Sequence, residues 1–467
     1  MGSKIIKSKD LDKIGYSTNK LRSLVVNIVK KEFKHHNKEE ILNVLKEVKL
    51  NWAKYLNHKN LNRIAEEFMD KKVEDKRSIY LLDELAKEFK VYGKQNISST
   101  TIKQMELCMQ LPISKYGALM SDAHLGYGLP IGSVLATKDS VIPYGVGMDI
   151  ACRMSLSLYK VSSQFLKRYS YQIKQSLKSC THFGMSKVDL PPNFHPILED
   201  TRFNETPLLK KLHGKACRQL GSSGSGNHFV DFGEVQLNED NSLNLEGGFY
   251  IGILAHSGSR GFGAEIANFY KQIAMKKCFL PKQAQHLAWL DMNTQEGQEY
   301  WLSMNLAGDY AKACHEIIHK NLAKSLGLKP VAYIENHHNF AWKEEINNEE
   351  LIVHRKGATP AHLGEMGIIP ANMIDTAYIV SGLGNSLSLN SASHGAGRKL
   401  SRNAAKLSIT GSELKKQLKQ NKVELIGGNV DEAPQSYKNM KEVMKSQSDL
   451  VQIEGTFQPK IIRMDKA

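Results

Sequence analysis

The sequence predicts an α+β fold, with one large domain of mixed strands and helices over residues 91–467 and a helical N-terminal extension over residues 1–90. Residues 3–90 contain a single glycine, Gly15, and their apolar residues recur at three- and four-residue steps, the period of an amphipathic helix. From about residue 98, short β-prone runs alternate with glycine-rich turns, without the regular strand–helix alternation of a parallel sheet.

Two segments of the extension predict helices. LRSLVVNIVKKEF (21–33) and EEILNVLKEVKLNWAKYL (39–56) each place apolar residues on one helical face and Lys and Glu on the other. We expect a small helical unit whose basic face is solvated rather than functional.

In the larger domain, seven runs rich in β-branched and aromatic residues predict strands: SVLATK, CRMSLSLYKV, HFVDF, FYIGILAH, VAYIENH, ELIVHRK and TAYIVSG. Residues 159–179 and 282–326 predict helices. Residues 431–467 predict a helix around MKEVMKSQSDLV and then a terminal strand. We therefore expect these elements to form a single α+β domain.

Composition restricts the class of protein. Of 467 residues, 41% are hydrophobic and 24% charged, as in globular proteins. The sequence contains no run of ~18 apolar residues, so we expect no membrane-spanning helix. The N-terminus lacks the apolar core of a secretory signal. The six cysteines are scattered along the sequence, which suits a reducing cytosol. We expect a cytoplasmic protein without membrane attachment. Lys and Arg total 63 against 48 Asp and Glu, a net charge of +15, which favours a polyanionic partner such as RNA or DNA.

Seven short segments combine His, Asp or Cys with glycine or other small residues. Such turns present a His ring with little steric cover, which suits a metal ligand or a nucleophile. The segments are SDAHLGYGLPIGS (121–133), GVGMDIAC (145–152), GSSGSGNHFVDF (221–232), LAHSGSRGFG (254–263), NHHN (336–339), HRKGAT (354–359) and SASHGAGR (391–398).

Asp149 and Cys152 lie three residues apart in GVGMDIAC. A carboxylate and a thiolate at this spacing can reach one metal ion or two adjacent ions, because the sulfur has lone pairs to bridge. His228, His256 and His338 would complete a site of N, O and S ligands, which fits Mn²⁺ or Zn²⁺ and not Ca²⁺. The alternative for Cys152 is a buried small apolar residue, the usual environment of a lone cysteine.

SASHGAGR is a candidate phosphate site. Gly395 and Gly397 leave backbone N–H groups open to a phosphate, and Arg398 adds a planar cation. His394 precedes these glycines and is placed to attack phosphorus or to transfer a proton. A plain glycine turn is the alternative.

The sequence also contains HExxH, the zinc-protease motif, at His315–His319. The motif lies in a helical stretch, and Glu335 offers a third ligand. The same positions suit the solvent face of an amphipathic helix whose apolar face carries Ala311, Cys314, Ile318 and Leu322. We favour this second interpretation.

Together, the segments resemble, in order, the signature stretches of the RtcB family of RNA-splicing ligases. The resemblance rests on SDAHLGYGLPIGSV, GVGMDIAC, GSGNHFVDF, HSGSRGFG, ENHHNFAWKEE, HRKGAT, GEMGIIP and SHGAGRKLSR, and it continues through GGNVDEAPQSYKN and KSQSDLVQIEGTFQP. It covers about residues 98–467, and eight ordered motifs are highly specific. Residues 1–90 have no clear counterpart in the shorter family members.

The resemblance implies an enzyme that joins an RNA 3′-phosphate or 2′,3′-cyclic phosphate to a 5′-hydroxyl, using GTP and two Mn²⁺ ions through a guanylyl-histidine intermediate. It implies that Asp149 and His228 bind one ion, that His256 and His338 bind the other, that Cys152 bridges them, and that His394 becomes guanylylated. The implied nucleotide pocket comprises Asn227, His228, Phe229, Asp231, His338, Asn339, Pro370, Ala371, Asn372, Met373, Ala377, His394, Gly395, Ala396, Gly397, Tyr437 and Lys466.

The chain departs from the family pattern at four positions. Asp231 stands where Glu usually reads the guanine edge, Asn372 and Ala377 stand where Ser is usual, and Arg153 stands where Gly is common. These departures question base selectivity more than the reaction, since they spare the metal ligands and His394. We expect Arg153 to place a bulky cation beside the metals.

Two other classes of function are kept open: a metal-dependent phosphoesterase or other hydrolase acting on RNA ends, and an RNA-binding protein without catalysis. The expected partner is broken or spliced tRNA or another structured RNA. The sequence leaves open the physiological RNA, any activating protein partner, the oligomeric state and the role of residues 1–90.

Overall fold

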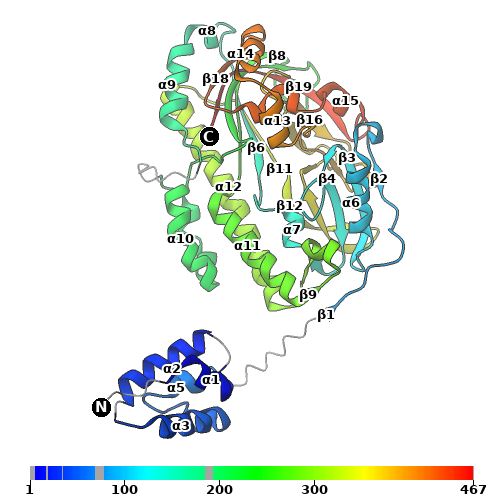
Figure 1. Ribbon diagram of the computed structural model, residues 1–467. Helices are drawn as coiled ribbons and strands as arrows, with labels where there is room; N and C mark the ends of the chain where they lie inside the picture. Colours follow the sequence, from blue (N-terminus) through cyan, green and yellow to red (C-terminus); the bar gives the residue numbers. More distant parts are fainter. Residues whose placement is uncertain (1–5, 17–18, 34, 69–77, 185–192, 466–467) are drawn as a thin grey trace. The chain divides into compact units, whose positions relative to one another are not determined.

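The computed structural model describes residues 6–16, 19–33, 35–68, 78–184 and 193–465. The chain divides into two compact units, Met1–Lys76 and Arg77–Ala467 (Figure 1). Strands β1 (Ser78–Ile79) and β2 (Lys90–Val91) both pair with strands of the second unit. This division therefore begins the large unit earlier than the boundary after residue 90 that the sequence suggests.

The first unit is helical, with α1 (Ser8–Lys13), α2 (Asn19–Glu32), α3 (Lys38–Leu50), α4 (Trp52–Tyr55) and α5 (Asn62–Ala65). The Asn37 side chain caps α3 by accepting a hydrogen bond from the Glu40 N–H. Leu11, Val25, Leu45 and Ile64 form its apolar core. Both segments predicted to be helical are helical.

The second unit is built around an eight-stranded sheet. Its strand order is β11 (Ala332–His337), β6 (Arg153–Tyr159), β8 (Gly248–Ser257), β7 (Phe229–Leu237), β19 (Val451–Met464), β16 (Ala377–Gly382) and β15 (Met366–Ile369), with β18 (Glu424–Ile426) parallel to β19. The end strands β11 and β15 contact each other, so the sheet curls around an apolar cluster. Alternate residues of β6, Met154, Leu156 and Leu158, point into that cluster.

The other face of this sheet is covered by helices α9 (Ser170–Cys180) and α12 (Gln295–Leu326) (Figure 1). Ile173 of α9 and Ile318 and Leu322 of α12 pack on strand residues such as Phe232 and Ile253. Helices α10 (Pro207–Gln219) and α11 (Arg260–Lys277) pack beside α12 and extend the core.

A second sheet has the order β12 (Asn339–Ile346), β13 (Glu349–Lys356), β4 (Ile131–Thr137), β3 (Ser114–His124) and β2, with α6 (Ser99–Met109) against β3. His338 lies between β11 and β12, where the chain passes from one sheet to the other. The remaining elements are β5 (Ser140–Val141), α7 (Pro143–Val146), α8 (Phe165–Arg168), β9 (Cys278–Phe279), β10 (Leu290–Asp291), β14 (Ala358–Pro360), β17 (Ser391–Ser393), α13 (Arg402–Ser408), α14 (Gly411–Gln420), α15 (Met440–Lys445) and short 3₁₀ turns.

The α+β prediction is confirmed. All seven β-prone runs form strands, and the C-terminal helix and strand are present as α15 and β19. The predicted helix 159–179 is wrong at its start, because Tyr159 ends strand β6 and the helices begin at Phe165 and Ser170. The predicted helix 282–326 also begins too early, since the Thr294 side chain caps α12. None of the described helices is long and apolar enough to span a membrane.

Candidate active site

Four neighbouring strands carry the predicted metal ligands to one edge of the large sheet. Cys152 directly precedes β6, His228 precedes β7, His256 lies near the end of β8 and His338 follows β11. The antiparallel register pairs Met154 and Phe229 with His256, so the starts of β6 and β7 meet the end of β8. Residues far apart in the sequence therefore converge because alternate strands run in opposite directions.

The donor atoms form a continuous series with sulfur in the middle. Cys152 Sγ lies 3.3 Å from His228 Nε2 and 3.1 Å from His256 Nε2. His228 Nε2 also lies 3.0 Å from Asp149 Oδ2, and His256 Nε2 lies 3.4 Å from His338 Nε2. One carboxylate, one thiol and three imidazoles thus face one another, and Cys152, His228 and His256 form the one group among the described residues that meets a geometric criterion for metal binding.

Burial changes the pKa values of these side chains in ways that bear on metal coordination. It lowers the pKa of His256 to about 3, and burial together with the nearby His394 and His256 lowers the pKa of His338 well below its ordinary value. Both imidazoles are therefore neutral near pH 7, the form that binds metals. Burial and the charge of Asp149 raise the pKa of the Cys152 thiol, so metal binding there would release a proton.

Local contacts orient the ligands. His256 Nδ1 lies 3.1 Å from the Asn227 carbonyl oxygen, an arrangement that places the proton on Nδ1 and leaves the Nε2 lone pair free. Gly258 lies against Asp149, because a Cβ there would stand 2.0 Å from Asp149 Oδ1. The donor set fits a transition metal such as Mn²⁺ or Zn²⁺.

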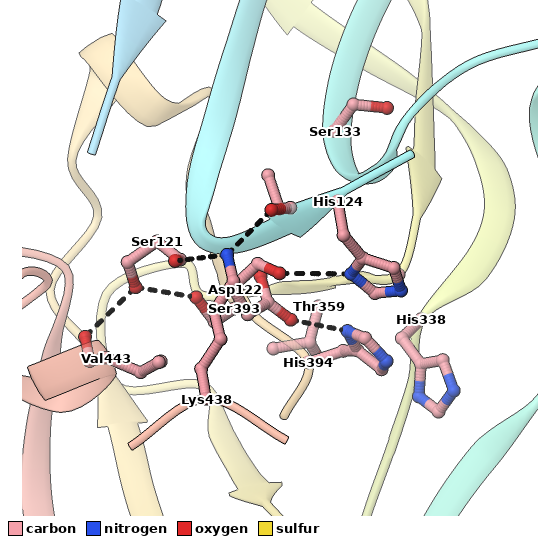
Figure 2. A network of polar contacts seen from close by, with 12 residues as sticks. Ser121, Asp122, His124, Ser133, His338, Thr359, Ser393, His394, Lys438 and Val443 are labelled. Atoms are coloured by element: carbon pink, nitrogen blue, oxygen red, sulfur yellow. Dashed lines mark hydrogen bonds and ion pairs between the residues drawn. The ribbon is translucent and has the colours of Figure 1, made fainter. Parts of the chain in front are cut away.

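His394 lies beside this cluster, with its ring centroid 4.8 Å from that of His338. Figure 2 shows His394 next to Asp122, whose Oδ2 lies 2.7 Å from His394 Nδ1. A carboxylate at Nδ1 keeps the proton on that nitrogen and leaves Nε2 with its lone pair. A proton held on Nδ1 would leave the Nε2 of His394 available for chemistry in the cavity.

Asp122 is itself held in place. It is fully buried, and Lys438 Nζ donates to the carbonyl oxygens of Ser121 at 3.3 Å and Ala123 at 2.7 Å on either side of it (Figure 2). Gly397, at φ +71°, lets the loop after His394 approach closely, since a Cβ there would stand 2.1 Å from the Asp122 carbonyl oxygen. The sequence marked SDAHLG as a segment of interest, but only the fold reveals the role of Asp122.

A cavity of about 370 Å³ extends from the cluster. It is lined by the predicted residues Asp149, Cys152, Asn227, His228, Phe229, Asp231, His256, His338, Asn339, Pro370, Ala371, Asn372, Met373, Ala377, His394, Gly395, Ala396, Gly397 and Tyr437. Lys466, also predicted there, lies outside the described residues. Lys356, Arg402 and Glu432 line the cavity as well, and no feature of the sequence singles them out for this position.

Among the polar groups that line the cavity, Asp231 has an oxygen without a hydrogen-bond partner among the described residues. Asp231 is buried, its Oδ1 has no hydrogen-bond partner among the described residues, and burial raises its pKa well above the ordinary value. Tyr437 and Glu432 also line the cavity, and the Tyr437 hydroxyl donates a hydrogen bond to Glu432. Asn372 is engaged with its own turn, donating to Asp375 Oδ2 at 2.8 Å.

Two arginine expectations need correction. Arg153 does not line the cavity. Its side chain contacts Glu335 at 3.0 Å and the Gly308 carbonyl, because Arg153 is the first residue of β6 and points to the face of the sheet opposite that of Met154. The guanidinium of Arg398 lines the cavity, but it donates to the carbonyl oxygens of Leu400 at 3.0 Å and Asp431 at 2.7 Å.

The HExxH residues do not converge. His315 Nδ1 bonds the Ala311 carbonyl at 2.9 Å, and His319 Nδ1 contacts Ser157 Oγ at 2.7 Å. Glu316 pairs with His195, while Glu335 pairs with Arg153 and Lys312. The expectation that His315 and His319 face solvent is wrong, because both are buried between α12 and the sheet.

Comparisons with known proteins place the geometry in context. A family model described as tRNA-splicing ligase RtcB matches residues 104–464. The chain is 32% identical over 371 residues to the RNA-splicing ligase RtcB of Escherichia coli (strain K12), covering 73% of this chain and 88% of that protein. It is 27% identical over 449 residues to the tRNA-splicing ligase RtcB of Thermococcus kodakarensis, covering 80% of this chain and 91% of the relative. It is 28% identical over 420 residues to RNA-splicing ligase RtcB homolog 1 of Entamoeba dispar, covering 74% of this chain and 78% of that protein.

Proposed function

This chain belongs to the RtcB family of RNA-splicing ligases, and we propose that it joins RNA ends bearing a 3′-phosphate or 2′,3′-cyclic phosphate to 5′-hydroxyl ends, consuming GTP and requiring two Mn²⁺ ions. The observation that carries this proposal is the series Asp149, His228, Cys152, His256 and His338, with the sulfur in contact with a histidine on each side.

The series supports a two-ion assignment. Cys152 Sγ contacts His228, whose Nε2 also contacts Asp149, and it contacts His256, whose Nε2 also contacts His338, so we propose that the sulfur is shared between two ions. When bound there, the metal ions would neutralise phosphate charge and make phosphorus more electrophilic. Zn²⁺ suits the same donor set, and metal-dependent assays distinguish the two.

His394 is the proposed nucleophile. Its Nε2 attacks the α-phosphorus of GTP, a P–N bond forms, and the bond to pyrophosphate breaks. Asp122 holds the imidazole by Nδ1 and stabilises the positive charge that develops on the ring. The protein thereby replaces one difficult transfer with two easier ones.

The guanylyl group then passes from His394 to the RNA 3′-phosphate. The 5′-hydroxyl oxygen attacks this activated phosphate, a new phosphodiester forms, and GMP leaves. A 2′,3′-cyclic phosphate is first opened by water to give the 3′-phosphate.

The far part of the cavity suits guanine. Asp231 Oδ1 is buried without a partner among the described residues. Burial raises the pKa of this carboxyl group, and the N1–H and N2–H₂ donors of a bound guanine would favour its ionised form. Phe229 and Tyr437 also line this cavity and offer apolar rings beside a base. Asp231, being one methylene shorter than Glu, is proposed to reach the base directly or through one water.

The net charge of +15 favours an RNA partner, bound in a salt-dependent way. All six cysteines are free, which suits the reducing cytoplasm where we place the enzyme.

The proposal is tested by incubating the protein with a 3′-phosphate strand, a 5′-hydroxyl strand, Mn²⁺ and GTP, and by resolving the products on a denaturing gel. We expect a joined product that requires GTP and is not supported by ATP. Hydrolysed ends without joined product would favour the phosphoesterase alternative and contradict the proposal.

A further inference from the structure

A second and larger cavity, of about 1380 Å³, lies beside the active site. The two cavities share wall residues, so the second one adjoins the cavity that His394 lines. The shared residues are His124, Ile131, Asn372, Asp375, Arg398, Arg402 and Tyr437. The nucleotide site described above accounts for the smaller cavity only.

The larger cavity is basic. Its walls carry five cationic side chains, Arg398, Lys399, Arg402, Lys438 and Lys441, against the two carboxylates of Asp375 and Glu442. Arg398, Arg402 and Lys438 are engaged by protein acceptors. Lys399 and Lys441 are exposed, and among the ion pairs of the described residues none involves either lysine. Two ammonium groups are thus available to a ligand in the cavity.

One wall presents apolar side chains to solvent. Leu125 is 56% exposed and Tyr127 is 73% exposed, although both line the cavity. They lie on the loop that follows β3, close to Asp122 in the sequence. An exposed aromatic ring beside cations is the combination that proteins use to hold single-stranded nucleic acid.

This loop is held rigidly. The Gln104 side chain donates to the carbonyl oxygens of Gly126 at 2.6 Å and Gly128 at 2.7 Å, and it accepts from the Gly126 N–H at 3.2 Å. Lys356 Nζ donates to the Tyr127 carbonyl oxygen. The backbone is therefore fixed while the Tyr127 ring stays exposed, which lowers the entropy cost of stacking a base on it.

We propose that this cavity, which we call the strand groove, binds the single-stranded RNA segment next to the break, with Lys399 and Lys441 contacting backbone phosphates and Tyr127 stacking on a base. The inference rests on the proposed RNA-joining function. Its occupant is RNA because the terminal phosphate must reach His394, and the groove is continuous with the cavity that His394 lines. An acidic peptide would match the lysines but would leave the exposed tyrosine ring without a role.

The test uses full-length protein and three variants: the double variant Lys399→Gln/Lys441→Gln, Tyr127→Ala and Tyr127→Phe. We expect the double variant and Tyr127→Ala to raise the KM for RNA about tenfold, a loss equivalent to one stacked base or two phosphate contacts. Tyr127→Phe should retain near-normal KM, since the ring is kept. Guanylylation of the protein by GTP without RNA should be unchanged in all three.

Direct binding is measured by fluorescence anisotropy with two labelled ten-nucleotide strands, one ending in a 3′-phosphate and the other beginning with a 5′-hydroxyl. The strand whose affinity falls in the variants identifies which RNA end occupies the groove. The double variant should also show a shallower dependence of log Kd on log salt, because each lost phosphate contact reduces counterion release.

The matched control is Lys167→Gln/Lys178→Gln, which removes two exposed lysines on α8 and α9 that do not line the groove. Its affinity for both strands should stay within about twofold of wild type. Wild-type affinity in both groove variants, or an equal loss in the control, would overturn the groove assignment. Failure of the wild type to become guanylylated would instead reject the proposed function, while the binding measurements would still decide on the groove.

Discussion

Two sets of buried histidines lie in the large unit, and they differ in what their ring nitrogens face. His228, His256 and His338 lie at the ends of separate strands and line one cavity, where His228 and His256 contact the Cys152 sulfur and His338 contacts His256. His315 and His319 lie one turn apart on α12, where His315 contacts the Ala311 carbonyl of the same helix and His319 contacts Ser157 of β6. Side-chain convergence, rather than burial or motif, therefore distinguishes the candidate centre.

Titration behaviour alone would not separate the two sets. Burial lowers the pKa of His256 to about 3, and it lowers the pKa of His319 to about 3 as well. His256 Nε2 lies beside two further donor atoms, Cys152 Sγ and His338 Nε2. The His319 ring instead packs against Ser157 and Tyr333.

The largest effect is expected at the shared sulfur. Cys152→Ser replaces a thiolate with a hydroxyl that does not ionise near neutral pH, so we expect Mn²⁺ affinity to fall at least 100-fold and RNA joining to become undetectable. Calorimetric titration of the apoprotein with Mn²⁺ measures the affinity. The matched control is Cys314→Ser, at a buried free cysteine on α12, which should bind Mn²⁺ normally. Equal affinities in the two variants would place Cys152 outside the metal site.

A smaller effect is expected at the residue that orients His394. Asp122→Asn keeps the shape of the side chain but removes its charge, so the preferred tautomer of His394 is lost and guanylylation should slow about 100-fold. Mn²⁺ affinity should be unchanged, which separates orientation from coordination. Asp309→Asn, at an exposed carboxylate paired with Arg202, serves as the control. A guanylylation rate in Asp122→Asn like that of the control would show that Asp122 does not orient the nucleophile.

Substitution of the HExxH histidines on α12 should lower the stability of the protein without lowering its activity. His315→Ala removes a fully buried side chain that bonds the Ala311 carbonyl, so the free energy of unfolding should fall by about 1–3 kcal/mol. Guanylylation and RNA joining at low temperature should stay within about twofold of wild type. The same substitution at His256 should abolish both. Loss of activity in folded His315→Ala protein would restore the zinc-motif interpretation.

The last effect concerns the pH dependence of stability and leaves activity near neutral pH unchanged. Because the pKa of His319 is lowered from 6.5 to about 3 in the folded state, its contribution to stability is present above pH 6.5 and is lost as the pH falls toward 3. His319→Gln cannot titrate, so its free energy of unfolding should decline less between pH 7 and pH 4 than that of the wild type. Urea unfolding at several pH values measures this, and parallel declines would contradict the burial-based pKa.

The sequence predicted the parts of the molecule that depend on local pattern. The seven β-prone runs were identified because their β-branched and aromatic residues are visible within a few positions, and all of them form strands. Helix α11 was not predicted, because it begins inside the glycine-rich segment LAHSGSRGFG and contains Gly261 and Gly263. The helix predicted from residue 159 overran strand β6, since Leu158 and Tyr159 fit either period.

For the candidate site, the family resemblance identified the expected ligands and the expected nucleophile. The fold identified which other side chains contact them. Residues 394–397 and Cys152 could be singled out from short glycine-containing motifs. Asp122 could not be assigned, because its partner His394 is 272 positions away and only the fold brings them to 2.7 Å. Likewise, the direction of the Arg153 side chain depends on the pleat of β6, which is known only once the strand's register is fixed.

The central claim is that His394, beside the sulfur-centred cluster, carries the guanylyl group. Full-length protein is incubated with Mn²⁺ and α-labelled GTP, denatured, and separated on a gel. The account predicts a covalent label that is labile to acid and stable to alkali, is absent without Mn²⁺, and is absent in His394→Ala. Wild-type protein that takes up no label, or a His394→Ala variant that is labelled as strongly as the wild type, would contradict it.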